Sequence, residues 1–256
     1  MRHMDPDRPR RSAADTRARI LKKAVAEFAA KGYGGARIDA IAKAAQTNIR
    51  MLYHYFGGKE ELYLAVLESV INDLRMEELK LDFSEEDDAL EGLLQMFDFI
   101  DHHFSRHAEL RNILSGENLN RARYMKKSAL IPTMSSPVLS LLQALIRKGQ
   151  KAGAIRREVD ALHLYVTMVS LVSYHKTNAY TLSTIFREDL TGEAWQTEQR
   201  QFNRTLLTSF LRPPCAEPAP RTKAAGKSGA GKAGADKSSA GKSSAGKSGS
   251  TTRKRD

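Results

Sequence analysis

The sequence predicts an all-α fold. Apolar residues recur at the spacing of one helix face along most of the 256 residues, and the alternation typical of strands is nearly absent. Glycines, prolines and short polar runs separate these periodic segments. A chain of this length can form one large helical domain or two smaller ones around a sizeable buried core.

The N-terminal region is predicted to contain a basic arm and a first helix. Residues 1–14 contain two prolines and four arginines, a composition typical of a disordered segment. Asp15 or Thr16 can cap the helix that follows, and three glycines between residues 32 and 35 are expected to end it. Its predicted core stripe is formed by Ile20, Leu21, Ala24, Val25 and Phe28.

Two short helices joined by a tight turn are predicted in residues 38–59. Gln46 and Thr47 form the turn, and Asn48 is a favourable N-cap for the second helix. Leu52 and Phe56, four residues apart, anchor that helix to the core. The inward-facing positions of the first helix are Ile38, Ile41, Ala42 and Ala45. This is the pattern of a helix-turn-helix, which places the start of its second helix in the major groove of DNA.

Helical periodicity continues through the middle of the chain. The predicted segments are residues 63–74, 93–104, 110–119, 121–127 and 138–150. Pro132 and Pro137 are expected to break the helical pattern before the last of these segments.

Two C-terminal helices are predicted to bury large apolar surfaces. Residues 160–180 are apolar around the whole helix axis, so one face must be covered by the protein's own domain and the other by a partner subunit. The last helix, residues 192–211, is expected to carry one broad apolar stripe and to stop at two prolines. The stripe consists of Trp195, Phe202, Leu206, Leu207 and Phe210.

The remaining chain, residues 213–256, is predicted to be a disordered lysine-rich tail. It contains lysine every five residues from Lys227 to Lys247, without an aromatic or a large aliphatic residue to form a core. The predicted organisation is a basic arm (1–14), a helix-turn-helix domain (15–60), a helical domain (61–212) and the tail (213–256).

The charge distribution indicates a polyanionic partner. The net charge of the whole chain is +11. Residues 12–59 have a net charge of +6 and residues 221–256 of +8, whereas residues 60–220 have a net charge of −5. The basic ends suit nucleic acid. Cys215 is the single cysteine, which excludes an intramolecular disulfide and favours the cytosol. The N-terminus lacks the apolar run of a signal peptide, and residues 161–172 are too short to span a bilayer, so no membrane partner is expected.

The second short helix is expected to present its outward side chains to DNA. Arg50 can bond guanine in the major groove, and Ile49 or Tyr53 can pack on thymine methyl groups, with His54 beside them. Phosphate contacts are expected from Arg37, Tyr55 and Lys59, and Asn48 completes the predicted DNA-binding set. A run such as Tyr53 to Phe56 is more often core packing when seen alone, but here the spacing, the cap and the local charge agree.

The chain resembles the TetR family of transcriptional regulators over roughly residues 16–65. The resemblance lies in Phe28-(x)3-Gly32-Tyr33, Ile41-Ala42-(x)2-Ala45 and Leu52-Tyr53-His54-Tyr55-Phe56-(x)2-Lys59-Glu60. Three residues depart from the usual pattern: Arg37 replaces a common Thr, Gln46 the turn glycine and Asn48 the commonest residue, Ser. Gln46 must therefore accept a conformation that glycine takes more easily.

The resemblance implies a ligand-responsive regulator, by family default a repressor. It would dimerise through helices at about 160–180 and 193–211, bind a palindromic double-stranded DNA operator and be released by a small molecule. It would be cytoplasmic and associated with the bacterial nucleoid. The alternative is a ligand-independent architectural or nucleoid-associated protein that uses its basic tail for affinity. The tail itself is either a sequence-independent DNA clamp or a solubilising extension, and Arg8, Arg10 and Arg11 can enter the minor groove.

Polar or aromatic residues set into apolar helix faces are candidates for the ligand pocket. They are Phe99, His103, Tyr165, Met168, Tyr174 and His175, and a core role remains the alternative for each. Residues 170–186 resemble a TetR subgroup that includes regulators of pyrimidine catabolism. No cofactor or metal site is predicted, because the adjacent His102 and His103 point to different helix faces. No phosphate loop or nucleophile motif suggests an enzyme.

Overall fold

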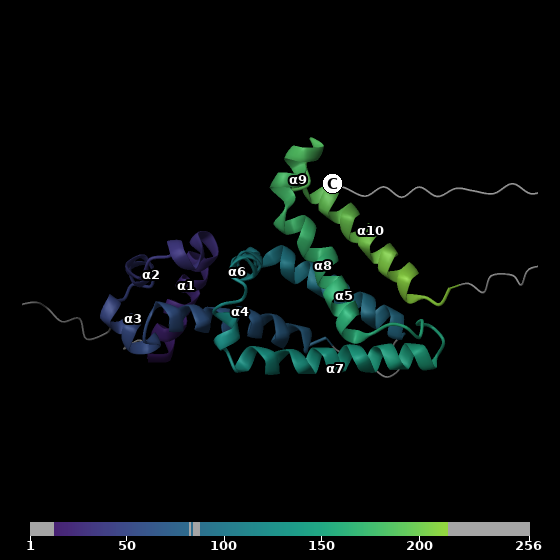
Figure 1. The fold of residues 1–256 in the computed structure, drawn as a ribbon, viewed down its shortest axis with the longest axis horizontal. Helices are drawn as coiled ribbons and strands as arrows, with labels where there is room; N and C mark the ends of the chain where they lie inside the picture. The colour runs from purple at the N-terminus through teal and green to yellow at the C-terminus, as the bar shows by residue number, and fades with distance from the viewer. Residues whose placement is uncertain (1–12, 82, 84–87, 215–256) are drawn as a thin grey trace, which may run out of the picture. The chain divides into compact units, whose positions relative to one another are not determined.

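The computed structural model describes residues 13–81, 83 and 88–214. These residues form α-helices and one short 3-10 helix, with no strand among them, which confirms the all-α prediction. In chain order the helices are α1 Ala13–Gly35, α2 Ile38–Ala44, α3 Ile49–Phe56, α4 Lys59–Glu78, α5 Ala89–Arg106, α6 Ala108–Leu119, η1 Met125–Lys127, α7 Leu130–Lys151, α8 Ala161–Thr177, α9 Ala179–Phe186 and α10 Glu193–Leu211 (Figure 1). The basic arm up to residue 12 and the tail from residue 215 lie outside the described residues.

The first helix begins earlier than predicted, whereas the glycines between residues 32 and 35 end it as predicted. It starts by Ala13, so Asp15 lies in its first turn rather than at its cap, where a carboxylate still complements the helix dipole. Near its end Gly32 has φ 64° and ψ 176°, which breaks the helix geometry before a last turn that reaches Gly35. A residue with a Cβ would adopt this conformation only with strain.

Helix α7 runs straight through the two prolines that were expected to break it. Pro132 lies in the first turn, where its missing N–H group would have had no partner. Pro137 lies inside the helix and removes one hydrogen bond, but the apolar face of α7 compensates by burying Val138, Leu142 and Ile146. By length and hydropathy α7 could also cross a membrane, but such a signal is common in core helices, and α7 packs on α4, α5 and α8.

The segment predicted as a helix at residues 121–127 is mainly a tight turn. Arg121 and Ala122 have positive φ angles of 56° and 54°, which no helix accommodates. The buried carboxylate of Glu117 accepts backbone N–H groups of Tyr124 at 3.2 Å and Met125 at 3.0 Å, and only then does η1 form. The turn is therefore specified by a residue outside it.

The two C-terminal helices divide their apolar residues between the core and the surface. In α8, Leu164, Met168 and Val172 are buried in the core, whereas Leu162, Val166 and Tyr174 are exposed. The expected single stripe of α10 also splits. Leu207 and Leu211 face the core, while Phe202 (63% exposed), Leu206 and Phe210 (46% exposed) face outward.

Candidate DNA-binding site and ligand cavity

Helices α1, α2 and α3 share one apolar core. Ile20, Ala24 and Phe28 of α1 meet Ile41 of α2 and Leu52 of α3, and all five are at most 1% exposed. Ala42 and Ala45 are buried as predicted, and Ile38 is half-buried against the same core. The short side chains let α2 approach its neighbours closely. The core thus fixes α3 relative to α1.

The turn between α2 and α3 adopts the conformation that the sequence predicted. Gln46 has a φ of 50°, a left-handed conformation that costs a non-glycine residue about 1 kcal/mol. The backbone N–H of Thr47 donates to Ala42 O at 3.0 Å, which closes the turn. Arg19 Nε of α1 donates to the carbonyl oxygen of Ala45, the C-cap of α2, at 2.7 Å, so α1 supplies a hydrogen bond to the end of α2. Asn48 then caps α3, its side-chain oxygen accepting from Met51 N at 2.8 Å.

Helix α3 presents one face to the core and the other to solvent. Leu52 and Phe56 are buried, as predicted. Ile49 is 43% and Tyr53 47% exposed, and Arg50 and His54 are exposed beside them. Exposed apolar and aromatic side chains next to an arginine at the start of a short helix are what base contact in a major groove requires.

The three predicted phosphate-contacting residues flank this face. Tyr55 is half-buried against the core, with its ring at 5.4 Å from that of His54. The Lys59 ammonium lies 4.9 Å from the centre of the Tyr33 ring. Arg37 precedes α2 and pairs with Asp39 at 3.1 Å, which lowers the pKa of the Asp39 carboxyl. Both partners of this pair are exposed, so a phosphate can replace Asp39 at little cost.

The residues predicted to line a ligand pocket do not converge on one cavity. Met168 is fully buried core, and Phe99 is half-buried 5.7 Å from the His103 ring. Tyr174 and His175 line two open cavities beside α10. Burial lowers the pKa of His175, whose ring contacts Gln196 at 3.2 Å and the Leu171 carbonyl at 3.0 Å. The six residues therefore remain separate predictions.

Tyr165 belongs to a buried polar network that ties α4 to α8. Its hydroxyl donates to Glu78 Oε1 at 2.8 Å and accepts from Arg75 Nη1 at 2.5 Å, and Arg75 also pairs with Glu78. Glu78 is fully buried, and this burial raises its pKa despite the arginine. The last turn of α4 is thus held by charge and hydrogen bonds as well as by packing.

A polar cavity of about 450 Å³ is lined by residues of α5, α6, α8, α9 and α10. Lys176 pairs with Asp101 at 3.1 Å, and both side chains are buried. Arg111 also lines the cavity, and its Nη1 is buried without a hydrogen-bond partner in the described part of the chain. None of these residues was predicted as a pocket residue. A Lys or Arg within an apolar helix pattern was the available signal, but surface positions give the same signal.

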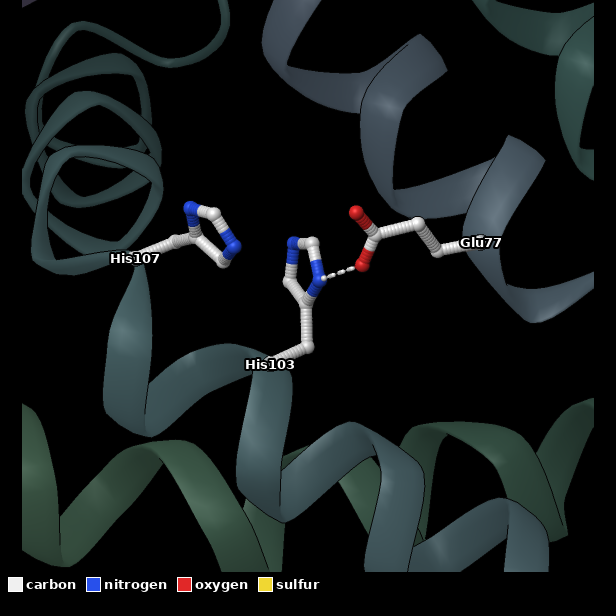
Figure 2. Close-up of side chains that lie close together, drawn as sticks. All are labelled: Glu77, His103 and His107. Atoms are coloured by element: carbon white, nitrogen blue, oxygen red, sulfur yellow. Dashed lines mark hydrogen bonds and ion pairs between the residues drawn. The ribbon is translucent and has the colours of Figure 1, made fainter.

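A second group joins His103, which was predicted only as a ligand-pocket residue, to Glu77 and His107, which were not predicted. Figure 2 shows His103 between the carboxylate of Glu77 and the ring of His107. One candidate donor atom from each residue lies within 4.8 Å of the others. The prediction that the chain has no metal site considered only the adjacent pair His102 and His103. The informative spacing was instead the four residues from His103 to His107, which places His107, the residue between α5 and α6, one turn beyond His103.

Comparison with known proteins agrees with this architecture. Residues 20–66 match the family model for bacterial regulatory proteins of the tetR family, and residues 90–206 match the model for the Tetracyclin repressor-like, C-terminal domain. The HTH-type transcriptional repressor NicS of Pseudomonas putida is 34% identical over 199 residues, which cover 77% of this chain and 92% of NicS. The repressor SCO4008 of Streptomyces coelicolor is 32% identical, with 62% of this chain and 77% of that protein covered.

Solved structures agree on the fold. The Streptomyces coelicolor transcriptional regulator SCO4942 superposes with a TM-score of 0.59 at 24% identity, covering 77% of this chain and 99% of that chain. A tetR family transcription regulator from a Shewanella species has a TM-score of 0.54 at 16% identity, covering 77% and 97%. The two family-model matches and the extended similarity to repressors together show that the chain belongs to the TetR family of bacterial HTH-type transcriptional regulators.

Proposed function

We propose that this TetR-family regulator is a dimeric repressor that binds a palindromic operator and releases it when a small molecule binds. One observation carries the proposal. Helix α3 is capped, anchored by Leu52 and Phe56, and exposes Arg50 and Tyr53 at its outer face. The family and its repressor relatives favour this function over the architectural alternative.

The proposed operator contacts fall into two classes. Ile49, Arg50, Tyr53 and His54 contact base edges, whereas Arg37, Tyr55 and Lys59 contact phosphates and Asn48 positions the helix. Base contacts give specificity, and phosphate contacts give salt-dependent affinity that is common to all sequences. The two classes therefore predict different mutational signatures.

The proposed dimer interface uses the outer faces of α8 and α10. Leu162 and Val166 of α8 are exposed, as are Phe202, Leu206 and Phe210 of α10, spaced four residues apart. Exposed apolar residues in such numbers mark an interaction surface. A two-fold pairing of these helices forms a four-helix interface and presents two copies of α3 to one operator.

The proposed effector site is the cavity that contains Arg111, Lys176 and Asp101. The cavity is lined by more cationic than anionic side chains, because Arg200 adds a further positive charge and Glu193 a further negative one. The unpartnered Nη1 of Arg111 calls for a hydrogen-bond acceptor. A small polar effector with an anionic group fits this chemistry. Binding releases DNA only to the extent that the effector prefers the non-binding conformation.

The experiment begins with selection of operator sequences from genomic DNA by the purified full chain. Against the selected operator, Arg50→Ala should lose specific affinity by about 1–3 kcal/mol, because a bidentate base contact is removed. Arg157→Ala is the matched control, since this exposed arginine lies between α7 and α8, outside the proposed site. Equal losses in the two variants, or no enriched palindrome, would refute the proposal.

The dimer and the effector site have separate tests. Leu206→Asp places a charge on the exposed stripe of α10 and should produce a monomer in analytical ultracentrifugation with loss of palindrome binding. A dimer that persists in this variant contradicts the proposed interface. Arg111→Met should abolish the thermal stabilisation produced by anionic metabolites that release wild-type protein from DNA. Retained stabilisation contradicts the assigned cavity.

A further inference from the structure

Glu77, His103 and His107 bring two imidazoles and a carboxylate together where α4 approaches the junction of α5 and α6. We propose that these three residues bind a divalent transition-metal ion, with Zn²⁺ the best fit, and that occupancy of this site changes operator affinity. The site is separate from the polar cavity of the proposed effector, because none of the three residues lines that cavity.

The geometry already pre-positions the donors. His103 Nδ1 lies 3.0 Å from Glu77 Oε2, and His103 is only 3% exposed, so its ring is held in place. His107 is exposed, and its ring centre lies 4.2 Å from that of His103 at an angle of 30°. Ligand atoms around a tetrahedral zinc ion are separated by about 3.3 Å, so donors that lie within 4.8 Å need small rotations. Glu77 and His107 are exposed, so their side chains have room to make these rotations.

The chemistry of the donor set selects the ion. Imidazole nitrogen suits Zn²⁺, Co²⁺ and Ni²⁺, whereas Mg²⁺ and Ca²⁺ prefer sites made of oxygen. Two histidines four residues apart and a carboxylate from another helix form a three-ligand site in which water completes the tetrahedron. Glu77 can ligate directly or orient His103 through its hydrogen bond, and either role raises affinity.

The surroundings favour a cation on balance and place it next to the DNA-binding helices. His103 and His107 line a cavity of about 580 Å³ that is also lined by Asp73 and Glu109, and by Lys22 and Lys23 of α1. Asp73 lies one turn before Glu77 on α4, and its carboxylate interacts electrostatically with both histidines as well as with Glu77. The two lysines oppose a cation, but their two positive charges are fewer than the three negative charges of Asp73, Glu77 and Glu109.

The position of the site gives it a route to DNA binding. Helix α4 begins directly after the proposed recognition helix, and α6 packs against α1. A metal ion that joins Glu77 of α4 to His103 and His107 fixes the angle between α4 and the α5–α6 junction. It favours whichever arrangement of the DNA-binding helices has that angle, and the reciprocal effect of DNA on metal affinity must be equal. This regulatory half rests on the proposed function, whereas metal binding does not.

Metal binding is tested on the full chain with Co²⁺ and Zn²⁺. The wild type should bind one equivalent of Co²⁺ per protomer with the visible absorption of a tetrahedral site, and Zn²⁺ should displace it. Glu77→Gln and His107→Gln should each weaken Zn²⁺ binding by at least about tenfold. His163→Gln is the matched control, because His163 lies 3.0 Å from Asp160 in a similar imidazole–carboxylate pair. Among the described residues, no second imidazole joins that pair in a potential metal-binding group.

The outcomes separate the two halves of the proposal. Absence of the Co²⁺ spectrum in the wild type, or equal Zn²⁺ affinity in the wild type and His107→Gln, overturns the site. Operator affinity is then measured with and without Zn²⁺ in the wild type and in His107→Gln. A Zn²⁺ response confined to the wild type supports the coupling, and no response in a protein that binds both Zn²⁺ and operator overturns it. Failure to find any operator refutes the proposed function but leaves the Co²⁺ result standing.

Discussion

Asn48 should contribute about 1 kcal/mol to the local stability of α3, the proposed recognition helix, through a single hydrogen bond. Its side-chain oxygen accepts from Met51 N at 2.8 Å, and α3 is only eight residues long. Replacing an Asn cap by Ala costs about 0.5–2 kcal/mol. At about 1 kcal/mol, amide hydrogen exchange within α3 should accelerate about fivefold in Asn48→Ala. Operator affinity should fall by no more than the same factor, because binding must restore the frayed first turn.

Two further substitutions separate the cap from direct DNA contact. Asn48→Ser keeps a capping oxygen and should exchange like the wild type. Asn48→Asp also keeps the cap and adds a negative charge that suits a helix N-terminus but repels phosphate. It should therefore preserve slow exchange while weakening operator binding. Unchanged exchange in Asn48→Ala, measured by mass spectrometry on peptides covering α3, would refute this account of the helix.

Three more outcomes are expected. Tyr165→Phe removes the hydroxyl that donates to buried Glu78. The free energy of unfolding, measured in urea, should therefore fall by about 1.5–3 kcal/mol, and a decrease below about 0.5 kcal/mol contradicts the network. Burial lowers the pKa of His175, so the unfolded state binds a proton at this histidine more readily than the folded state does. The stability that comes from keeping His175 neutral is therefore complete above the unfolded pKa of about 6.5 and is lost as the pH falls below it. The free energy of unfolding should therefore fall from pH 7 to pH 5 less steeply in His175→Gln than in the wild type, and parallel curves would be contrary evidence. Removing residues 221–256 should lower affinity for all DNA and reduce the salt slope by about 0.9 for each phosphate that the tail neutralises, whereas an unchanged slope would leave the tail only a solubilising role.

The sequence predicted best what short-range spacing determines. The Asn48 cap, the buried pair Leu52 and Phe56, and the strained turn at Gln46 are properties of neighbouring residues, and the structure confirms all three. The all-round apolar segment at residues 160–180 was also informative. One face of α8 is buried, and the other is exposed for the proposed partner.

The features that the sequence did not predict depend on interactions between distant residues. Pro137 was expected to break a helix, but the buried face of α7 outweighs the one hydrogen bond that the proline removes. The turn before η1 depends on Glu117, and the polar cavity depends on residues from several helices that meet only in the fold. Spacing along the chain could suggest that His103 and His107 lie close together but not that both meet Glu77.

The Arg75–Glu78–Tyr165 network holds the last turn of α4 in place, so that a tilt of α4 about this turn displaces its first turn. Its first turns belong to the DNA-binding core, where the Tyr63 ring lies 4.8 Å from that of Phe28, and its last turn is tied to Tyr165 of α8. Twenty residues of helix span about 30 Å, so a tilt of about 5° at the anchored end moves the other end by about 3 Å. That distance is comparable to the length of a hydrogen bond. In the proposed complex with DNA, a tilt of this size is therefore enough to make or break a hydrogen bond between α3 and a base.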